Sequence, residues 1–270
     1  MNRPSPQPES SASTEPERRA PDAAPAADTP VQDLPFKASP AKAARLRPRD
    51  AATMIVLDRR GRGGPKVLMG RRNARLAFMP GQFVFPGGRI ELGDRTMPVA
   101  GALPDYAEAA LARQVSRPPH HLGRALALAA IRETYEETGL LLGTTEHGGP
   151  ETVPAGWEAF AAHGVLPDLE ALHVVARAIT PPKRVRRFDT RFFAVDRTMV
   201  AAEEPGRVSA DTEFTELAWV RLDAARKLDL PYITRAILDE LEAQIAVDFA
   251  PHRPIPFHYE RYGRRERVFL

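Results

Sequence analysis

The residues best suited to chemistry lie in the run Arg132-Glu133-Thr134-Tyr135-Glu136-Glu137-Thr138-Gly139. On an α-helix with Glu133 at 0°, Glu136 falls at about 300° and Glu137 at about 40°, so the three carboxylates share an arc of about 100°. Like charges at this spacing destabilise a helix by roughly 0.2–0.5 kcal/mol, and acids near its C-terminus lose about 0.3–1 kcal/mol. A hard divalent cation removes both costs, and oxygen-only ligands favour Mg²⁺ or Mn²⁺. The alternative is a solvated, glutamate-rich helix surface.

The segment ahead of this helix also suits phosphate chemistry. Phe85-Pro86-Gly87-Gly88-Arg89-Ile90-Glu91-Leu92-Gly93-Asp94 places a rigid turn and two adjacent glycines before an acidic patch. Glycine lets the backbone approach a ligand closely and present N–H groups to phosphate. A Pro-Gly-Gly sequence alone is typical of an ordinary turn. The same turn followed by a helix that ends in this acidic run indicates a metal and phosphate site.

Together these residues resemble the Nudix box, G-x₅-E-x₇-R-E-U-x-E-E-x-G-U, in which U is a bulky apolar residue. Asp94 stands where the family usually has glutamate, and Thr134 replaces an apolar residue. Asp94 and Arg132 are 38 positions apart, against 8 in the pattern, which corresponds to 30 inserted residues. The positions that match the box are Gly88, Arg132, Glu133, Glu136, Glu137, Gly139 and Leu140.

The inserted residues make the chain similar to one Nudix branch, the coenzyme A diphosphatases with a long box. FVFPGG precedes the insertion and AIRETYEETGLLL follows it. ITPP at 179–182 and RRFDTRFF at 186–193 are similar to a second signature of that branch. The arginine motif ahead of the box in coenzyme A-cleaving relatives is met only loosely, by the run Gly70–Arg75, which contains Arg71. The resemblance covers roughly residues 50–250.

The resemblance implies a chemistry and a set of site residues. Mg²⁺ or Mn²⁺ held on Glu133, Glu136 and Glu137 would bridge a diphosphate and activate a water for in-line attack on phosphorus. Arg132 would orient the carboxylates rather than bind substrate. The Gly87-Gly88 pair would lie against the substrate.

Further residues complete the expected site. Glu213 and Glu216 are candidates for the general base, and Glu216 is the one assigned; the alternative is that both are exposed acids at a strand end. A cluster of basic residues between two predicted strands includes Arg187 and Arg191. This cluster either holds an anionic substrate, for example the phosphoadenosine end of coenzyme A, or is an ordinary solvated loop. Arg71 is the remaining substrate-binding candidate.

The pattern of apolar residues predicts the elements that position the site. Strands are expected at 51–58 and 66–72, joined as a hairpin, and at 82–90, 172–182, 190–196 and 214–222. Helices are expected at 105–115, 123–140, 156–164 and 232–246. Strands and helices mixed without strict alternation favour an α+β domain. The family resemblance implies a Nudix-type α/β/α sandwich with a mixed β-sheet and a loop–helix–loop box that carries an insertion.

Three regions are expected along the chain. Residues 1–45 are rich in proline, alanine and serine, which is typical of a disordered tail. Residues 46–250 are the expected Nudix hydrolase domain, with the insertion at about 95–122. Residues 251–270 are expected to form a basic C-terminal tail.

Composition narrows the function classes. Lys plus Arg (38) nearly balance Asp plus Glu (35), which argues against nucleic acid as the main partner. The absence of cysteine excludes disulfides and thiolate metal sites. No run approaches the roughly 18 apolar residues of a membrane span, and no signal peptide is recognised, so a cytoplasmic protein is expected. The sequence does not specify an oligomeric state.

Several functions are compatible with these residues. The first is hydrolysis of a diphosphate linkage in a nucleoside diphosphate–X, with coenzyme A or acyl-coenzyme A as the substrate suggested by the resemblance. The alternatives are a non-catalytic Nudix-like module that senses a nucleotide, or a hydrolase of ADP-ribose, NADH or capped RNA. Because all three helix carboxylates are present, catalysis is favoured over sensing.

Overall fold

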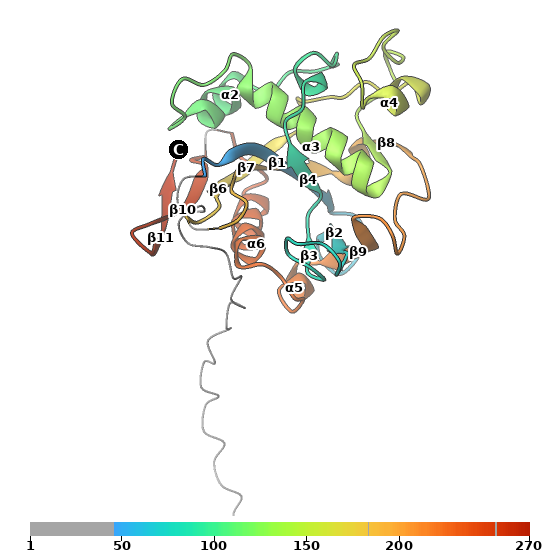
Figure 1. The fold of residues 1–270 in the computed structure, drawn as a ribbon. Coiled ribbons are helices and arrows are strands. Elements are labelled where there is room, and N and C mark those ends of the chain that lie inside the picture. Colours follow the sequence, from blue (N-terminus) through green and yellow to red (C-terminus); the bar gives the residue numbers. More distant parts are fainter. Residues whose placement is uncertain (1–45, 183, 252) are drawn as a thin grey trace, which may run out of the picture. The chain divides into compact units, whose positions relative to one another are not determined.

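The fold is built on a central mixed β-sheet. The computed structural model describes residues 46–182, 184–251 and 253–270. In this part of the chain the nine-stranded sheet has the order β11-β10-β6-β7-β1-β2-β3, with β4 paired to β1 and β9 paired to β2 (Figure 1). Its strands are β1 (Arg49–Asp58), β2 (Lys66–Arg72), β3 (Phe83–Val84), β4 (Gly87–Arg89), β6 (His173–Ile179), β7 (Phe188–Asp196), β9 (Phe214–Arg221), β10 (Pro256–Arg261) and β11 (Arg264–Phe269). The short strands β5 (Leu140–Leu142) and β8 (Val200–Glu203) pair separately.

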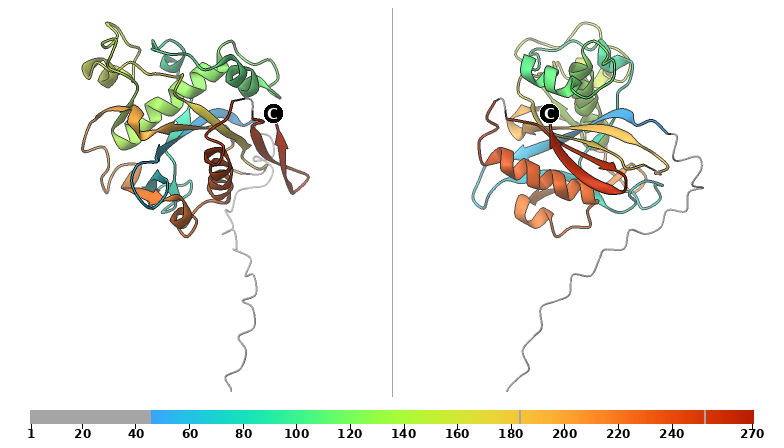
Figure 2. Two further views of the ribbon diagram at one scale, coloured as in Figure 1. Left: turned by 180° about the vertical axis from the view of Figure 1, so that it is seen from behind. Right: turned by 90° about the vertical axis from the view of Figure 1, so that its left-hand side faces the viewer.

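Helices cover both faces of the sheet, so the predicted α+β sandwich with a mixed sheet is confirmed. Figures 1 and 2 show α2 and α3 on one side of the sheet and α5 and α6 on the other. The helices are α2 (Asp105–Ala112), α3 (Leu122–Thr138), α4 (Glu158–Ala162), α5 (Leu222–Ala225) and α6 (Tyr232–Ile245), with 3₁₀ turns η1 (Gly93–Arg95) and η2 (Arg197–Met199). None of the helices in the described residues is long and apolar enough to cross a membrane.

Strand β1 lies within the sheet and contributes side chains to two hydrophobic cores, one on each face. It pairs in parallel with β7 and antiparallel with β2 and β4, and the predicted β1–β2 hairpin is confirmed. Successive side chains point to opposite faces of a strand. Met54 and Val56 therefore join the core beneath α3, whereas Ile55 and Leu57 join the core beneath α6. The expected strand at 82–90 is divided into β3 and β4 at Pro86, which has no N–H to donate to a ladder.

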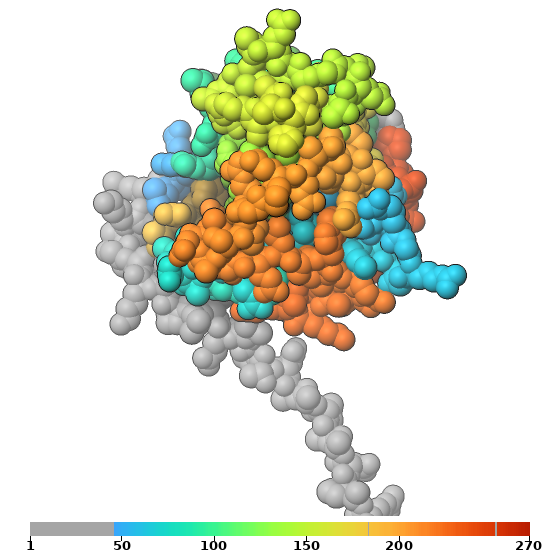
Figure 3. All heavy atoms as spheres, turned by 90° about the vertical axis from the view of Figure 1, so that its right-hand side faces the viewer, coloured from blue at the N-terminus to red at the C-terminus, as the bar shows by residue number. Residues whose placement is uncertain are grey.

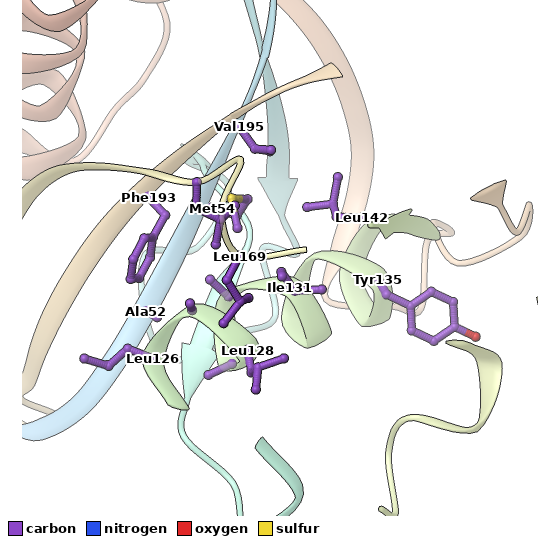
Figure 4. Packing of buried hydrophobic residues seen from close by; sticks show 14 of the residues in the cluster. Ala52, Met54, Leu126, Leu128, Ile131, Tyr135, Leu142, Leu169, Phe193 and Val195 are labelled. Carbon is purple, nitrogen blue, oxygen red and sulfur yellow. The ribbon is translucent and has the colours of Figure 1, made fainter. Parts of the chain in front are cut away.

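Helix α3 is buried on all sides over its middle turns, where every residue from Ala125 to Ile131 is buried. Leu126, Leu128 and Ile131 pack against β1 and β7 (Figure 4). Tyr135 lies at the end of this cluster, and Figure 4 shows its hydroxyl directed away from the packed side chains. This packing fixes α3 in the core, and the acids lie in its last two turns.

The inserted residues are part of the core rather than an appendage. Met97, Leu103 and Leu111 are buried in the same cluster as α3. Glu108 of α2 accepts hydrogen bonds from the backbone N–H groups of Gly123 (3.0 Å) and Arg124 (2.8 Å). The first N–H groups of a helix have no partner within it, so this carboxylate caps α3 from another helix. The insertion thus stabilises the helix that follows it.

The C-terminal segment is folded, which corrects the expectation of a basic tail at 251–270. β10 pairs in parallel with β6 and antiparallel with β11, which forms an edge of the sheet. Phe257 and Leu270 are buried, and the Arg177 guanidinium lies 4.5 Å from the centre of the Phe257 ring. Four of the six residues of β11 are charged, so composition alone concealed the strand. The expected tail at 1–45 lies outside the described residues.

Candidate functional site

The acidic run occupies the last two turns of α3, as the sequence predicts. The helix ends at Thr138, and Gly139 has the left-handed φ of 82° that favours glycine after a helix. Its N–H donates to the carbonyl of Tyr135 at 2.8 Å. A Cβ at Gly139 would lie 2.1 Å from the carbonyl oxygen of Glu204, so a larger residue would displace the backbone that follows β8. Glycine here lets the acidic end of α3 pack closely against that segment.

Arg132 is buried beneath the acids and its donors are almost fully used. Its Nε and Nη2 donate to the two oxygens of Asp94 at 2.9 and 3.1 Å, and Nη2 also donates to the Arg89 carbonyl. Its Nη1 donates to Glu133 and Glu136 at 3.1 Å. Burial alone would lower the pKa of Arg132, but the bonds to Asp94 and the neighbouring carboxylates raise it above its ordinary value. Arg132 is therefore a permanent cation that orients the carboxylates, as the resemblance implies.

Asp94 lies directly behind Arg132 despite the long insertion that separates them in the sequence. It is fully buried and also accepts a hydrogen bond from the Glu91 N–H at 2.7 Å. A bidentate carboxylate–guanidinium pair is both strong and geometrically specific. Asp94 therefore holds the box loop and α3 together, and its side chain positions Arg132 rather than facing the cleft.

The three glutamates differ in environment. The Glu136 side chain is 41% exposed and that of Glu133 is 17% exposed, while Glu137 is buried. Burial raises the pKa of Glu133 to about 7, and the charges of Glu136 and Glu213 act in the same direction against Arg132. Burial also raises the pKa of Glu137 well above its ordinary value, assisted by Glu213 and Glu133. Burial and the neighbouring carboxylates therefore both disfavour the ionised forms of Glu133 and Glu137.

The two box glycines lie against these carboxylates. The N–H of Gly87 donates to Glu137 Oε2 at 2.9 Å. A Cβ at Gly88 would lie 2.1 Å from Glu133 Oε1, so only glycine leaves room for that carboxylate. Both glycines are in β4, whose pairing with β1 fixes the distance between the loop and the helix.

A cleft of about 440 Å³ opens over the acids. One side is formed by Glu133, Glu136 and Glu137, and the other by the segment that joins β8 to β9, with the start of β9. The residues on this second side are Gly206, Arg207, Thr212, Glu213 and Phe214. Figure 3 shows the face that carries this joining segment, in orange, beside the yellow-green residues of about 145–170.

The chain is similar in sequence and structure to proteins named as Nudix hydrolases. The chain is 25% identical over 192 residues to "Putative nudix hydrolase 7" of Caenorhabditis elegans, which covers 64% of this chain. It spans about half (51%) of that protein's length. The crystal structure of a Nudix hydrolase from Alicyclobacillus acidocaldarius matches with a TM-score of 0.55 and 27% identity, over 76% of this chain and 97% of that one. No family model matches the sequence.

The chain is thus similar to Nudix hydrolases in sequence and in structure. Its α+β architecture is that of the Nudix fold. The Nudix box of this chain comprises β4, the following loop, the insertion and α3, so the box helix and loop meet in space although 38 positions separate Asp94 from Arg132.

The Nudix acids are suited to a hard divalent cation, although in the described residues no three side chains are already arranged to bind a metal ion. Their oxygens bond to protein donors instead: Glu133 and Glu136 accept from Arg132, and Glu137 accepts from Gly87. All three nevertheless line one cleft, and carboxylate oxygens are the donors that Mg²⁺ and Mn²⁺ prefer. A cation bound beside Glu133 and Glu137 would stabilise their ionised forms, which burial disfavours in the metal-free protein.

The structure separates the two candidate bases. Glu213 lines the cleft and accepts from Arg72 Nη1 at 2.5 Å. Glu216, the assigned candidate, is paired with Arg71 at 3.0 Å and is not among the residues lining the cleft. Glu213 directly precedes β9, whereas Glu216 lies within β9 opposite Arg71 of β2. Arg71, assigned to substrate binding, is engaged by Glu216 and by the Phe83 ring at 4.6 Å.

Two members of the expected basic cluster, Arg187 and Arg191, do not line the cleft. Arg191 is fully buried in β7, where its Nη1 is 2.6 Å from Asp50. Arg187 donates to the carbonyls of Thr180 and Leu46. Both arginines therefore have structural partners, and neither lines the cleft beside the Nudix acids.

Sequence reasoning missed the residues on the opposite side of the cleft. Arg207 and Thr212 lie about 70 positions beyond α3, in a segment with no periodic pattern. Glycine and proline at 205–206 marked only a turn. No local signal in the sequence joins this segment to the Nudix helix.

Proposed function

We propose that this protein is a metal-dependent enzyme that hydrolyses a diphosphate linkage in a nucleoside diphosphate–X substrate. The observation that carries the proposal is one cleft lined by Glu133, Glu136 and Glu137, with Arg132 fixed beneath them by Asp94. Such a cluster is unfavourable in isolation, because burial and mutual repulsion raise the pKa values of Glu133 and Glu137. The similarity to Nudix hydrolases supports the same function.

Glu133, Glu136 and Glu137 would hold Mg²⁺ or Mn²⁺. When bound, a divalent cation supplies positive charge that neutralises phosphate oxygens and lowers the pKa of a coordinated water. The protein's own residues do the positioning. Arg132 orients Glu133 and Glu136, and the Gly87 N–H orients Glu137. Gly87 and Gly88 lie against Glu137 and Glu133 and do not themselves line the cleft, so we propose that they act on substrate binding through these acids.

We assign the general base to Glu213 in place of Glu216. Glu213 lines the cleft opposite the Nudix acids, and its charge influences both Glu133 and Glu137. Arg72 fixes its carboxylate by a bond of 2.5 Å. A base must lie within hydrogen-bond reach of the water whose proton it takes. The place of Glu213 in the cleft therefore favours it over Glu216.

Coenzyme A or an acyl-coenzyme A is the substrate we propose to test first. The support is the long insertion within the box and the ITPP and RRFDTRFF segments, which resemble the coenzyme A diphosphatase branch. ADP-ribose, NADH, dinucleoside polyphosphates and capped RNA complete the panel, assayed with Mg²⁺ or Mn²⁺ and again after EDTA. Release of a nucleoside monophosphate or phosphoadenosine phosphate identifies the bond that is cleaved.

The first prediction tests the metal-binding acids. Glu133→Gln and Glu137→Gln keep the shape of each side chain but remove its charge, so each should lower the metal-dependent rate by about 100-fold or more, since charge stabilisation of this kind is worth several kcal/mol. The fold should be kept, with an unchanged or higher melting temperature in EDTA, because a repelled carboxylate is removed. Glu146→Gln, at an exposed position, is the control. Full activity in both variants would refute the metal-site assignment, and an inactive wild type across the panel would refute the function.

A further inference from the structure

Arg207 lies across the cleft from the Nudix acids and is held in place by α3 itself. Its guanidinium carbon is 4.4 Å from the centre of the Tyr135 ring, and its Nη2 donates to the Tyr135 hydroxyl and, at 3.0 Å, to Glu204. Tyr135 precedes Glu136 on α3, so the same helix that presents the acids also fixes this cation. Figure 4 shows the Tyr135 hydroxyl, which bonds to Arg207, pointing out of the apolar core.

The segment that carries Arg207 is anchored at both ends. After β8, the N–H of Glu204 donates to the carbonyl of Gly139 at 2.9 Å. Before β9, the side-chain amide of Asn73 donates to the carbonyls of Ala210 (2.9 Å) and Thr212 (3.2 Å). A segment fixed in this way presents its side chains at defined positions, as a preorganised binding site requires.

Arg207 differs from the other arginines near the cleft in its unused donors. Both of its hydrogen bonds to described residues come from Nη2, which leaves Nε and Nη1 without such a bond, and its side chain is 37% exposed. Arg132 uses Nε, Nη1 and Nη2 within the protein. Arg72 donates from Nε to Phe78 and from Nη1 to Glu213. Arg207 therefore offers a free edge of its guanidinium fork.

Charge in the cleft gives this free edge a role. Of the described residues that line the cleft, four are glutamates and Arg207 is the one cationic side chain. A diphosphate substrate is an anion, and repulsion from these glutamates would oppose its entry wherever a metal ion does not intervene. A planar guanidinium fork matches the geometry of phosphate oxygens.

We propose that Arg207 is a substrate-binding residue that donates from Nε and Nη1 to phosphate oxygens of the substrate, on the side of the cleft opposite the Nudix acids. This inference rests on the proposed diphosphate hydrolysis. It assigns to the segment between β8 and β9 the anion-binding role that the sequence suggested for Arg187 and Arg191. Tyr135 and Glu204 are positioning residues that hold Arg207 toward the cleft.

The test measures binding and catalysis separately. Affinity is measured by calorimetry with the Mg²⁺ complex of imidodiphosphate, a diphosphate that resists hydrolysis, and KM and kcat are measured with the best substrate of the panel. Arg207→Ala should raise both the Kd and KM by about 10-fold or more, because hydrogen bonds from a charged donor are lost. Arg207→Lys should recover part of the affinity, since it restores the charge without the fork.

Two controls separate phosphate binding from a structural role. Tyr135→Phe and Glu204→Gln each remove one positioning partner of Arg207 but keep its guanidinium, so the Kd should rise by only about two- to threefold, clearly less than in Arg207→Ala. Arg221→Ala removes an equal charge from an exposed position away from the cleft and should have no effect.

An unchanged Kd in Arg207→Ala, or an equal rise in Glu204→Gln and Tyr135→Phe, would overturn the inference while leaving the hydrolase intact. A wild type that neither binds imidodiphosphate nor cleaves any member of the panel would overturn the proposed function together with the inference.

Discussion

At the residue scale, Gly87 and Gly88 are adjacent but are constrained by different neighbours. A Cβ at Gly88 would meet the carboxylate of Glu133, the far end of a flexible side chain. A Cβ at Gly87 would lie 2.4 Å from the Ala52 carbonyl oxygen and 2.7 Å from Thr53 Cα, which are backbone atoms of the central strand. The first glycine is therefore required by the sheet and the second by the acidic site.

This difference gives the second prediction. Gly88→Ala should displace the Glu133 carboxylate and lower the metal-dependent rate, while the protein stays folded because the side chain can move. Gly87→Ala should instead lower the free energy of unfolding by about 1–3 kcal/mol, the usual cost of overpacking. Thermal melts in EDTA and rates with Mg²⁺ separate the two effects. Equal losses of stability in the two variants would contradict this account of Gly88.

The raised pKa of Glu133 leads to a third prediction, for the metal-free protein. A carboxyl group whose folded pKa is raised contributes stability below its unfolded pKa near 4.5, and this contribution is lost as pH rises through the folded value of about 7. The melting temperature in EDTA should therefore fall between pH 4.5 and pH 7.5, and Glu133→Gln should reduce this fall. Saturating Mg²⁺ should restore stability most at the upper end of the range. A pH dependence identical in the two proteins would contradict the raised pKa.

At the element scale, the insertion and α3 depend on each other. α2 supplies Glu108 as the N-terminal cap of α3, and Arg124 of α3 returns hydrogen bonds to the carbonyls of Arg95 and Met97. The beginning of the insertion and its helix α2 are thereby hydrogen-bonded to the start of α3. The acids lie at the other end of α3. The insertion acts on the Nudix site through the stability of α3.

The fourth prediction tests this cap. Glu108→Ala should lower the free energy of unfolding by about 0.5–2 kcal/mol, the cost of losing a helix cap. The Kd for Mg²⁺ in the folded protein should change little, because the acids remain in place. Urea unfolding gives the first quantity and metal titration the second, with Glu151→Gln at an exposed position as the control. Stability equal to wild type would show that Glu108 does not cap α3.

At the scale of the whole molecule, the C-terminal hairpin extends the sheet beyond β6. Phe257 and Leu270 form a small core with Ile255 and with Ala110 of α2. The hairpin therefore connects the end of the chain to the insertion, on the opposite edge of the sheet from β3. Burial of these side chains should therefore stabilise the whole domain.

The fifth prediction measures that contribution. Phe257→Ala should lower the free energy of unfolding by about 3–5 kcal/mol, as for other large aromatic side chains in cores. Tyr262→Ala, in the exposed turn of the same hairpin, should stay within about 0.5 kcal/mol of wild type. Urea unfolding of both variants is the measurement. Similar small effects in the two variants would contradict a stabilising role for the buried Phe257 side chain.

The features that could be predicted from the sequence depend on residues that are close together in the chain. The spacing of Glu133, Glu136 and Glu137 places three carboxylates on one side of a helix, and helix geometry is local. The apolar run of β1 and the glycine after α3 are local in the same sense. These features were enough to predict the acidic helix and its three clustered carboxylates, whereas the sandwich architecture was implied by the family resemblance.

Features that depend on contacts between residues far apart in the chain became visible only in the folded structure. Glu213 rather than Glu216 lines the cleft: Glu213 lies where the joining segment enters β9, whereas Glu216 lies within the strand opposite Arg71. Arg191 is buried because it lies opposite Ala52 and Arg177 in neighbouring strands, although its own segment is strongly basic. Arg207 reaches the cleft because the segment after β8 packs on the end of α3. Pairing across the sheet and packing between segments are set by the summed burial of many residues, so local spacing could not reveal them.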